Sequence, residues 1–282
     1  MQNVFHEFLT TMDPAPVRTW SLILTFYGDC IMPRGGELWL TNLSHILRAL
    51  GVKPNSARAA MSRLERDGIL ERRRVGRTSH YALSEGAIAL SRKAETVIYR
   101  RRAPVSEPGW DVIAMPAGMA DRKHLKAQGF QVLLPGLFLR PARGGSSDAA
   151  PEGALTMTAF GDDAEIAKTL YSLDGIAASY RDFIDAVPLI SGNAASATPL
   201  EALLLRLGLV HGFRRIVLRD PHLCPAALPK GWPADLAYER FADTYALLLP
   251  ASETWLDRHA HNAAGPLAPP TVGSRFFMDA AV

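Results

Sequence analysis

The first hundred residues carry apolar positions at the spacing of α-helices. An apolar stripe predicts one helix over 16–27 that is expected to end at Gly28. A second helix is predicted over 41–50 and a third from Pro54, a residue suited to the first helical turn, to Asp67. The third helix turns a stripe of small and apolar residues inward. The short turn Gly51-Val52-Lys53 joins the last two helices, and such a pair forms a helix-turn-helix.

A β-hairpin is expected directly after the third helix. Its first strand opens at Ile69-Leu70, the turn falls near Val75-Gly76, and the return strand covers 79–83. Ser84 then suits the N-cap of a helix that runs to about Tyr99. A helix-turn-helix followed at once by a hairpin is the layout of a winged helix, a type of DNA-binding domain.

Small polar and arginine side chains occupy the outward positions of the third helix and the tip of the hairpin. On a helix such side chains reach base edges in the major groove, whereas hairpin arginines suit phosphates. An arginine-rich helix face is otherwise ordinary solvated surface, and that alternative stays open. The candidate DNA contacts are Asn55, Ser56, Arg58, Ala59, Ser62, Arg63 and Arg66 on the helix, with Arg72, Arg73, Arg74, Arg77 and Thr78 on the hairpin. Asn55, Arg58, Ser62 and Arg63 are expected to read bases, and the hairpin arginines to hold the DNA backbone.

Charge is distributed unevenly along the chain. Residues 1–102 hold 16 Lys and Arg against 9 Asp and Glu, whereas the remaining residues hold 15 against 19. A basic region on an acidic body favours a polyanionic partner, although a solvated basic surface gives the same count. With 48% hydrophobic and 21% charged residues, the chain is not disordered throughout. No secretory signal, membrane-length apolar run or disulfide framework is visible, so we expect a cytoplasmic protein.

Several stretches resemble the PaaX family of bacterial transcriptional regulators, which is named for repressors of phenylacetic acid catabolism. The most specific is 21–40, with Tyr27-Gly28-Asp29 followed by Pro33-Arg34-Gly35-Gly36. The stretches 51–84 and 211–250 continue the similarity. The resemblance implies an α+β protein with a winged-helix domain and connector helix over 1–103, a ferredoxin-like domain over 104–190 and an α-helical domain over 191–282.

The pattern of the middle region suits that expectation. Strands are predicted over 110–116, within 130–141 and over 154–160, and helices over 122–130 and from Asp162 to Leu170. A Pro-, Gly- and Ser-containing stretch over 188–199 is expected to be irregular and to separate the middle region from the last domain.

The resemblance also implies a regulator that represses an aromatic-acid catabolic operon and leaves its operator when an aromatic acyl-CoA, such as phenylacetyl-CoA, binds. The expected partners are double-stranded promoter DNA, the acyl-CoA and a second copy of the chain, since a two-fold operator calls for a homodimer. The candidate effector residues are His211, Arg214, Arg215, Arg219, Trp232 and Tyr238. The alternative is that Trp232 belongs to the core and that the arginines form ion pairs within the domain.

An enzyme has to be weighed against a regulator, because small ferredoxin-like nucleases share the expected middle fold. A metal-dependent nuclease needs acidic ligands on its first strand, and Asp111 is the only acid within 110–116. The chain also lacks glycine-rich phosphate loops, nucleophile elbows and zinc spacings, so no cofactor or enzymatic activity is expected. A DNA-binding protein without a small-molecule effector is the third possibility.

Overall fold

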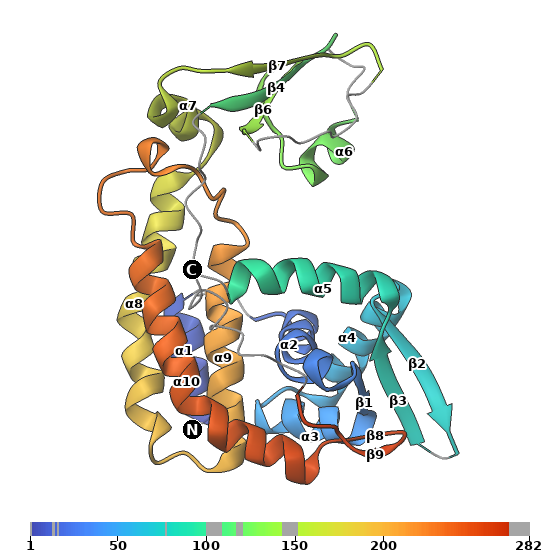
Figure 1. The fold of residues 1–282 in the computed structure, drawn as a ribbon. Coiled ribbons are helices and arrows are strands. Elements are labelled where there is room, and N and C mark those ends of the chain that lie inside the picture. The colour runs from blue at the N-terminus through green and yellow to red at the C-terminus, as the bar shows by residue number, and fades with distance from the viewer. Residues whose placement is uncertain are drawn as a thin grey trace. The chain divides into compact units, whose positions relative to one another are not determined.

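The computed structural model describes residues 2–12, 15, 17–76, 78–99, 109–116, 121–142 and 152–270. The chain divides into two compact units: 1–101, 179–218 and 234–282 form the first, and 102–178 with 219–233 form the second. Helices and small sheets occur together, which confirms the α+β class (Figure 1). The three-part division expected from the sequence stays a prediction.

The first unit contains a small antiparallel sheet and most of the helices. Its elements are α1 (Gln2–Met12), α2 (Thr19–Phe26), the π-helical turn η1 (Tyr27–Ile31), the 3-10 turn η2 (Met32–Arg34), β1 (Glu37–Trp39), α3 (Leu40–Ala49), α4 (Pro54–Arg66), β2 (Leu70–Val75), β3 (Thr78–Leu83), α5 (Glu85–Ile98), α9 (Pro199–Val217), α10 (Ala234–His259), β8 (His261–Asn262) and β9 (Gly265–Pro266). Helix α8 (Leu173–Ala194) begins in the second unit and continues into the first.

The prediction that Gly28 ends its helix was wrong. Helix α2 passes directly into η1 and η2, and the helical path stops only at Gly35, whose left-handed backbone (φ 99°) provides the C-cap. Tyr27, Asp29 and Cys30, on either side of Gly28, are all buried. Tertiary packing of these neighbours keeps the backbone helical where the local propensity of glycine favours a break.

Helices α3 and α4 and the hairpin after them follow the sequence pattern closely. Helix α4 begins with Pro54 in its first turn and buries Ala60, Met61 and Leu64. The two hairpin strands β2 and β3 pair from Leu70–Leu83 to Val75–Thr78. Strand β1, which the sequence analysis did not predict, adds to β3 and gives the order β1-β3-β2. Ser84 caps α5 as expected, because its Oγ accepts a hydrogen bond from the Ala87 N–H at 3.2 Å.

The remaining helices of the first unit pack through close backbone approaches and buried aromatic rings. A side chain at Gly208 or Gly212 of α9 would lie within about 3 Å of Phe5 or Phe8 on α1, so only glycine admits these rings. Helix α8 runs through Pro188, so the expected irregular stretch over 188–194 was wrong. Its buried residues on both sides of the proline hold the helix together despite the lost backbone hydrogen bond.

The second unit is built around a four-stranded antiparallel sheet. Its elements are β4 (Trp110–Ala114), α6 (Arg122–Ala127), β5 (Gln131–Leu134), β6 (Leu137–Pro141), β7 (Leu155–Ala159), α7 (Asp163–Leu170) and the 3-10 turn η3 (Pro225–Ala227). The strand order is β5-β6-β4-β7. The strands and helices expected from the sequence are thus present, with bounds shifted by a few residues.

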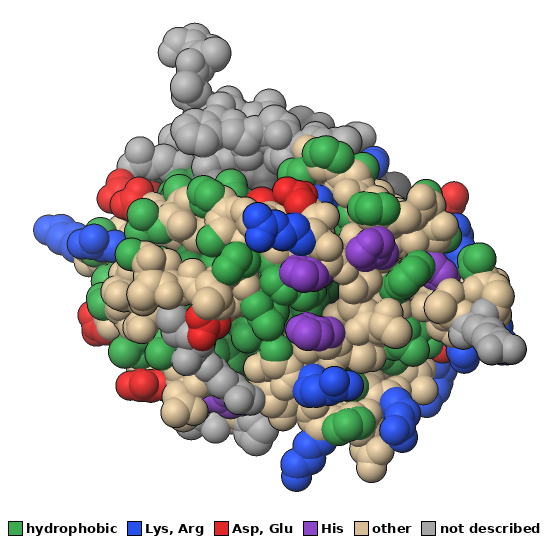
Figure 2. All heavy atoms as spheres, turned by 90° about the horizontal axis from the view of Figure 1, so that it is seen from below, with side chains coloured by type: hydrophobic (Ala, Val, Ile, Leu, Met, Phe, Trp, Pro, Cys, Tyr) green, Lys and Arg blue, Asp and Glu red, His purple; other side chains and the backbone are tan. Residues whose placement is uncertain are grey.

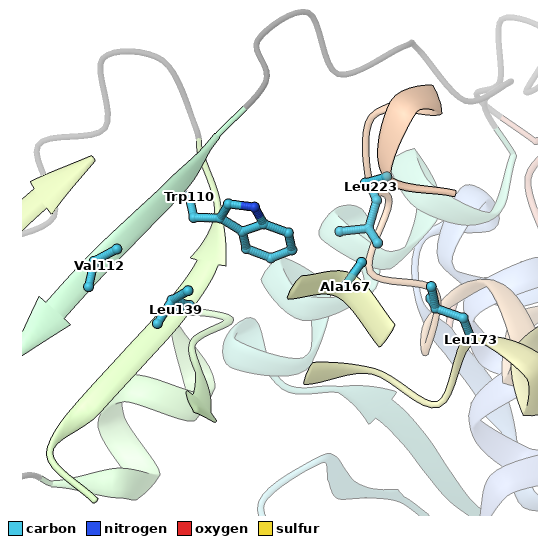
Figure 3. Packing of buried hydrophobic residues seen from close by; sticks show 7 residues of the cluster. Trp110, Val112, Leu139, Ala167, Leu173 and Leu223 are labelled. Atoms are coloured by element: carbon cyan, nitrogen blue, oxygen red, sulfur yellow. The ribbon is translucent and has the colours of Figure 1, made fainter. Parts of the chain in front are cut away.

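Each face of this sheet has its own core. Trp110, Val112 and Leu139 on one face pack with Ala167, Leu173 and Leu223, as Figure 3 shows. The indole N–H of Trp110 also donates to Asp163 Oδ1 at 2.8 Å, which fixes the start of α7. On the other face, Ile113 and Phe138 pack with Leu125 of α6. No helix among the described residues is long and apolar enough to cross a membrane.

Candidate nucleic-acid interface

The outward face of α4 is exposed at each position that the sequence analysis selected. These positions are Asn55, Ser56, Arg58, Ala59, Ser62, Arg63 and Arg66. Arg58 Nη1 donates to Asn55 Oδ1 at 3.2 Å, a contact between neighbours on the same exposed face. Such exposed contacts contribute little free energy, so both side chains can exchange them for contacts with a partner.

The hairpin presents arginines from an exposed strand. β2 is exposed from Glu71 to Val75, and the side chains of a strand alternate between its faces, so Arg72 and Arg74 share one face and Arg73 lies on the other. Arg72 Nη2 donates to Ser79 Oγ at 3.1 Å, and Arg73 Nη2 lies 3.6 Å from Glu71 Oε2.

The end of the hairpin is described only in part. Arg74 Nε donates to the Gly76 carbonyl at 3.3 Å, and the half-buried Thr78 donates its hydroxyl to the Val75 carbonyl at 2.8 Å. Arg77, the remaining candidate, lies outside the described residues. Arg72 and Arg74 therefore form exposed contacts with near neighbours, whereas Arg73 Nη1 also lies 3.9 Å from Glu37 Oε2 on β1. Ion pairs of exposed arginines are weak.

Arg63 is held more firmly than its neighbours on α4. Its guanidinium lies 4.8 Å from the centroid of the Trp20 ring, and its Nε is 3.4 Å from Asp67 Oδ2. The side chain remains half exposed, so it can still leave this position, at a cost of roughly 0.5–1 kcal/mol for an exposed cation–π contact. Trp20 lies in the helix predicted over 16–27, but its contact with Arg63 was not predicted from the sequence.

A buried ionic cluster lies inside the same unit. Asp29, in η1, accepts hydrogen bonds from Arg206 Nε at 2.7 Å, from the Tyr99 hydroxyl at 2.6 Å and from the Tyr245 hydroxyl at 3.0 Å. Arg206 also forms an ion pair with Glu253 on α10. Burial by itself would lower the pKa of Arg206, but its anionic neighbours, led by Asp29, raise it well above the usual value. We call this set the Asp29–Arg206 cluster.

Arg34 extends the cluster toward the end of α10. Its Nη2 forms ion pairs with Glu253 and, at 2.7 Å, with Asp257, and its Nη1 donates to the Ala268 carbonyl at 3.0 Å. The Arg34 side chain is only 1% exposed. Asp29 and Arg34 belong to the two short motifs 27–29 and 33–36, so in this structure those motifs connect the helix-turn-helix region to α9 and α10.

Aromatic and histidine side chains connect α3 to the end of α10. Asn42 donates its side-chain N–H to the His259 carbonyl at 2.6 Å, and the Trp39 ring stacks on His261 with centroids 5.6 Å apart. The ring of His45 on α3 lies beside the ring of Trp255, with centroids 5.8 Å apart. Figure 2 shows histidine side chains gathered among hydrophobic ones on this face of the molecule. The helix-turn-helix and the C-terminal helices are therefore joined by polar as well as apolar contacts.

The effector candidates fall into both units. His211 Nδ1 lies 2.9 Å from Thr25 Oγ1, and Arg214 Nη1 donates to the same oxygen at 2.6 Å and to the Ser21 carbonyl at 3.1 Å. Burial, with Arg214 and Arg215 nearby, lowers the pKa of His211 to about 3. His211 and Arg214 thus hold α9 against α2.

The other effector candidates lie apart from that contact. The Tyr238 hydroxyl donates to the Tyr99 carbonyl at 3.0 Å, and Arg215 is half-buried on α9. Arg219 and Trp232 belong to the second unit, where Trp232 packs beside the core of Trp110. The structure therefore brings only part of the candidate set together.

The acidic residue of the first strand in the second unit has a structural partner. Asp111 Oδ2 accepts from Arg140 Nε at 3.0 Å, and Arg140 also lies over the Phe130 ring. Within the described ranges, no group of three or more His, Cys, Asp or Glu side chains is arranged to hold a metal ion.

Comparisons with known proteins cover most of the chain. Residues 18–87 match the family described as PaaX-like protein, and residues 171–258 match the PaaX-like protein C-terminal domain. The transcriptional repressor PaaX of Escherichia coli strain K12 is 31% identical over 291 residues, which cover 95% of this chain and 91% of the relative. A solved structure of an uncharacterized protein from Mycobacterium tuberculosis is similar in fold, with a TM-score of 0.51 and 21% identity over 83% of this chain and 97% of that one.

These findings define the class of protein first: a transcriptional regulator of a non-enzymatic family. The chain belongs to the PaaX-like family. The family resemblance expected from the sequence is thereby confirmed, as is the expectation that the protein is not an enzyme.

Proposed function

We propose that the protein is a DNA-binding transcriptional repressor and that residues 1–103 form its winged helix-turn-helix domain. The main support is that helix α4 has an exposed polar face and is followed directly along the chain by the arginine-bearing hairpin β2–β3. A recognition helix in the major groove with a basic wing beside it gives both base contacts and phosphate contacts. The name of the E. coli relative, a transcriptional repressor, supports this proposal.

Asn55, Arg58, Ser62 and Arg63 read bases in this proposal, and Ser56, Ala59 and Arg66 are further DNA contacts on the same helix. Arg72, Arg73, Arg74, Arg77 and Thr78 contact the DNA backbone. The protein acts in the cytoplasm. It binds as a homodimer, because two recognition helices about 34–36 Å apart match a two-fold operator.

In this proposal residues 104–190 form a ferredoxin-like domain and residues 191–282 form a helical domain. The strand order β5-β6-β4-β7 with antiparallel neighbours supports this fold. Helix α7 follows β7 rather than preceding it, which is a departure from the β-α-β-β-α-β order.

The regulated genes form an aromatic-acid catabolic operon, and an aromatic acyl-CoA such as phenylacetyl-CoA releases the protein from its operator. A CoA thioester offers anionic phosphates, which arginines bind well, and an apolar acyl group. Arg215, Arg219, Trp232 and Tyr238 are candidates for this ligand, together with His211 and Arg214.

Fluorescence anisotropy on the promoter DNA upstream of the protein's own gene tests this function. The measurement is made at one stated salt concentration, with phenylacetyl-CoA, with free phenylacetate and with neither. We expect tight binding that only the thioester reverses. Promoter binding that neither compound affects would keep the proposed DNA-binding function and reject the acyl-CoA as its effector. Equal affinity for promoter and random DNA would reject the proposal that the protein is a repressor.

A further inference from the structure

A cavity of about 190 Å³ lies beneath helix α5 in the first unit. It is bounded by α2 and η1 (Leu24, Thr25, Gly28, Asp29), by the base of the hairpin (Ile69, Leu83), by α5 (Ala87, Leu90, Ser91, Ala94, Glu95, Ile98, Tyr99) and by α9 (Val210, Arg214). We call it the α5 cavity. Most of the residues around it are apolar.

Helix α5 is held at its two ends. At the start, Ser84 donates its hydroxyl to the Gly68 carbonyl at 2.7 Å and its N–H to the Ile69 carbonyl at 3.0 Å. At the far end, the Tyr99 hydroxyl donates to Asp29 at 2.6 Å.

Few side chains in the middle of α5 are buried. Within the helix only Ala87 and Ile98 are buried, and Leu90 is 68% exposed. A ligand in the α5 cavity therefore contacts a part of the helix that lies between its two end contacts.

The size and lining of the cavity define the ligand chemistry. An apolar cavity of roughly 150 Å³ admits a benzene ring, whereas pockets for whole drug-sized ligands measure about 300–1,000 Å³. Arg214 and Asp29 on its wall are already engaged, Arg214 with Thr25 and the Ser21 carbonyl and Asp29 with Arg206. Ser91 and Glu95 of α5 also line the cavity. The remaining surface suits one uncharged ring, with any bulky polar carrier left outside.

We propose that the α5 cavity binds the aromatic ring of an acyl ligand and that its occupation shifts the arginine hairpin relative to α4. This inference rests on the proposed DNA-binding function. The hairpin strand β3 leads through Ser84 directly into α5, and Ile69 and Leu83 at the hairpin base line the cavity. A ring wedged between α5 and α2 therefore moves the base of the hairpin, which carries the phosphate-binding arginines, away from the recognition helix.

Filling the cavity with a side chain tests the site. A Cβ added at Gly28 meets no atom within 4 Å and its backbone is not left-handed, so Gly28→Leu projects into the cavity space. Gly192→Leu is the matched control: Gly192 lies exposed in α8, it also has free space around an added Cβ, and it does not line the cavity.

Isothermal titration compares phenylacetyl-CoA with acetyl-CoA, which lacks the ring, on the full chain. The unmodified protein and Gly192→Leu are expected to bind phenylacetyl-CoA at least about tenfold more tightly, since burying the ring adds apolar contact. Gly28→Leu is expected to lose that preference. If Gly28→Leu does not fold, as judged by circular dichroism, Ala94→Leu fills the cavity from the opposite wall and is expected to give the same loss.

The outcomes separate this inference from the proposed function. A ring preference that survives in the filled variants, or one that is absent from the unmodified protein, overturns the cavity assignment even where promoter binding is intact. Absence of promoter binding in the unmodified protein overturns the proposed function instead. Loss of the ring preference in the filled variant alone supports the site.

Discussion

Arginines occupy two contrasting environments within the first unit. Arg34 and Arg206 are buried and paired with carboxylates from distant parts of the chain, whereas Arg58, Arg72 and Arg74 are exposed and contact only near neighbours. The buried arginines cannot leave their partners without stranding a buried charge, so they fix the fold. The exposed ones exchange partners cheaply, which a nucleic-acid surface requires.

The largest expected effect comes from breaking the buried set. Arg206→Leu leaves the buried Asp29 carboxylate without its arginine, whereas Glu253 keeps Arg34. We expect the unfolding free energy to fall by about 3–5 kcal/mol, because removing one partner leaves an uncompensated buried carboxylate. Urea denaturation measures the difference. Arg58→Leu, the same change on the exposed face of α4, is the control, with an expected shift within about 0.5 kcal/mol. Similar losses in both variants would contradict the distinction between the two environments.

A pH effect follows from the buried histidine beside Arg214. Because burial lowers the pKa of His211 to about 3, the unfolded chain takes up a proton below about pH 6.5 while the folded chain does not. Stability should therefore fall as pH drops from about 6.5 toward 3, with a slope approaching roughly 1.4 kcal/mol per pH unit from this group.

Urea titrations at several pH values check that slope. The His211→Asn variant keeps a polar side chain for the hydrogen bond with Thr25 and is expected to show a shallower decline. His45→Asn, which changes an exposed histidine, controls for the loss of any histidine. Parallel pH curves for His211→Asn and the unmodified protein would argue against a neutral buried His211.

On the exposed surface, Arg63→Ala tests base reading. We expect the preference for promoter over random DNA to fall by roughly 1–3 kcal/mol if Arg63 contacts a guanine. Anisotropy on both DNAs gives the difference, and the unfolding free energy is measured alongside it because Arg63 also packs on Trp20. Equal weakening on both DNAs would reject a base contact.

The smallest effect is expected from a single hairpin arginine. Arg73→Ala should weaken binding to all DNA sequences alike and reduce the slope of log affinity against log salt by about 0.9, the contribution of one phosphate contact. Lys93→Ala, an exposed charge on α5, serves as the control. An unchanged salt slope in Arg73→Ala would reject the phosphate contact.

Local patterns in the sequence were sufficient for the elements that carry the proposed interface. Pro54 at the start of α4, the apolar stripe inside it and Ser84 at the cap of α5 act within one or two turns, so neighbours along the chain determine them. The same reasoning failed at Gly28 and over 188–194, where buried side chains on both sides keep the helix going. Helix propensity is a weak preference that tertiary packing overrides.

The sequence by itself determined the α+β class, the two helices α3 and α4 with the arginine-bearing hairpin, and the family, because these rest on periodicity, capping and local motifs. Only the tertiary structure decided what the motif residues Asp29 and Arg34 do, since their partners Arg206 and Glu253 lie far along the chain. It also decided that His211 is buried against α2, and that a ring-sized space remains beneath α5. Ion pairs and cavities depend on which residues from distant parts of the chain come together in space. The pattern of residues along the sequence does not contain that information.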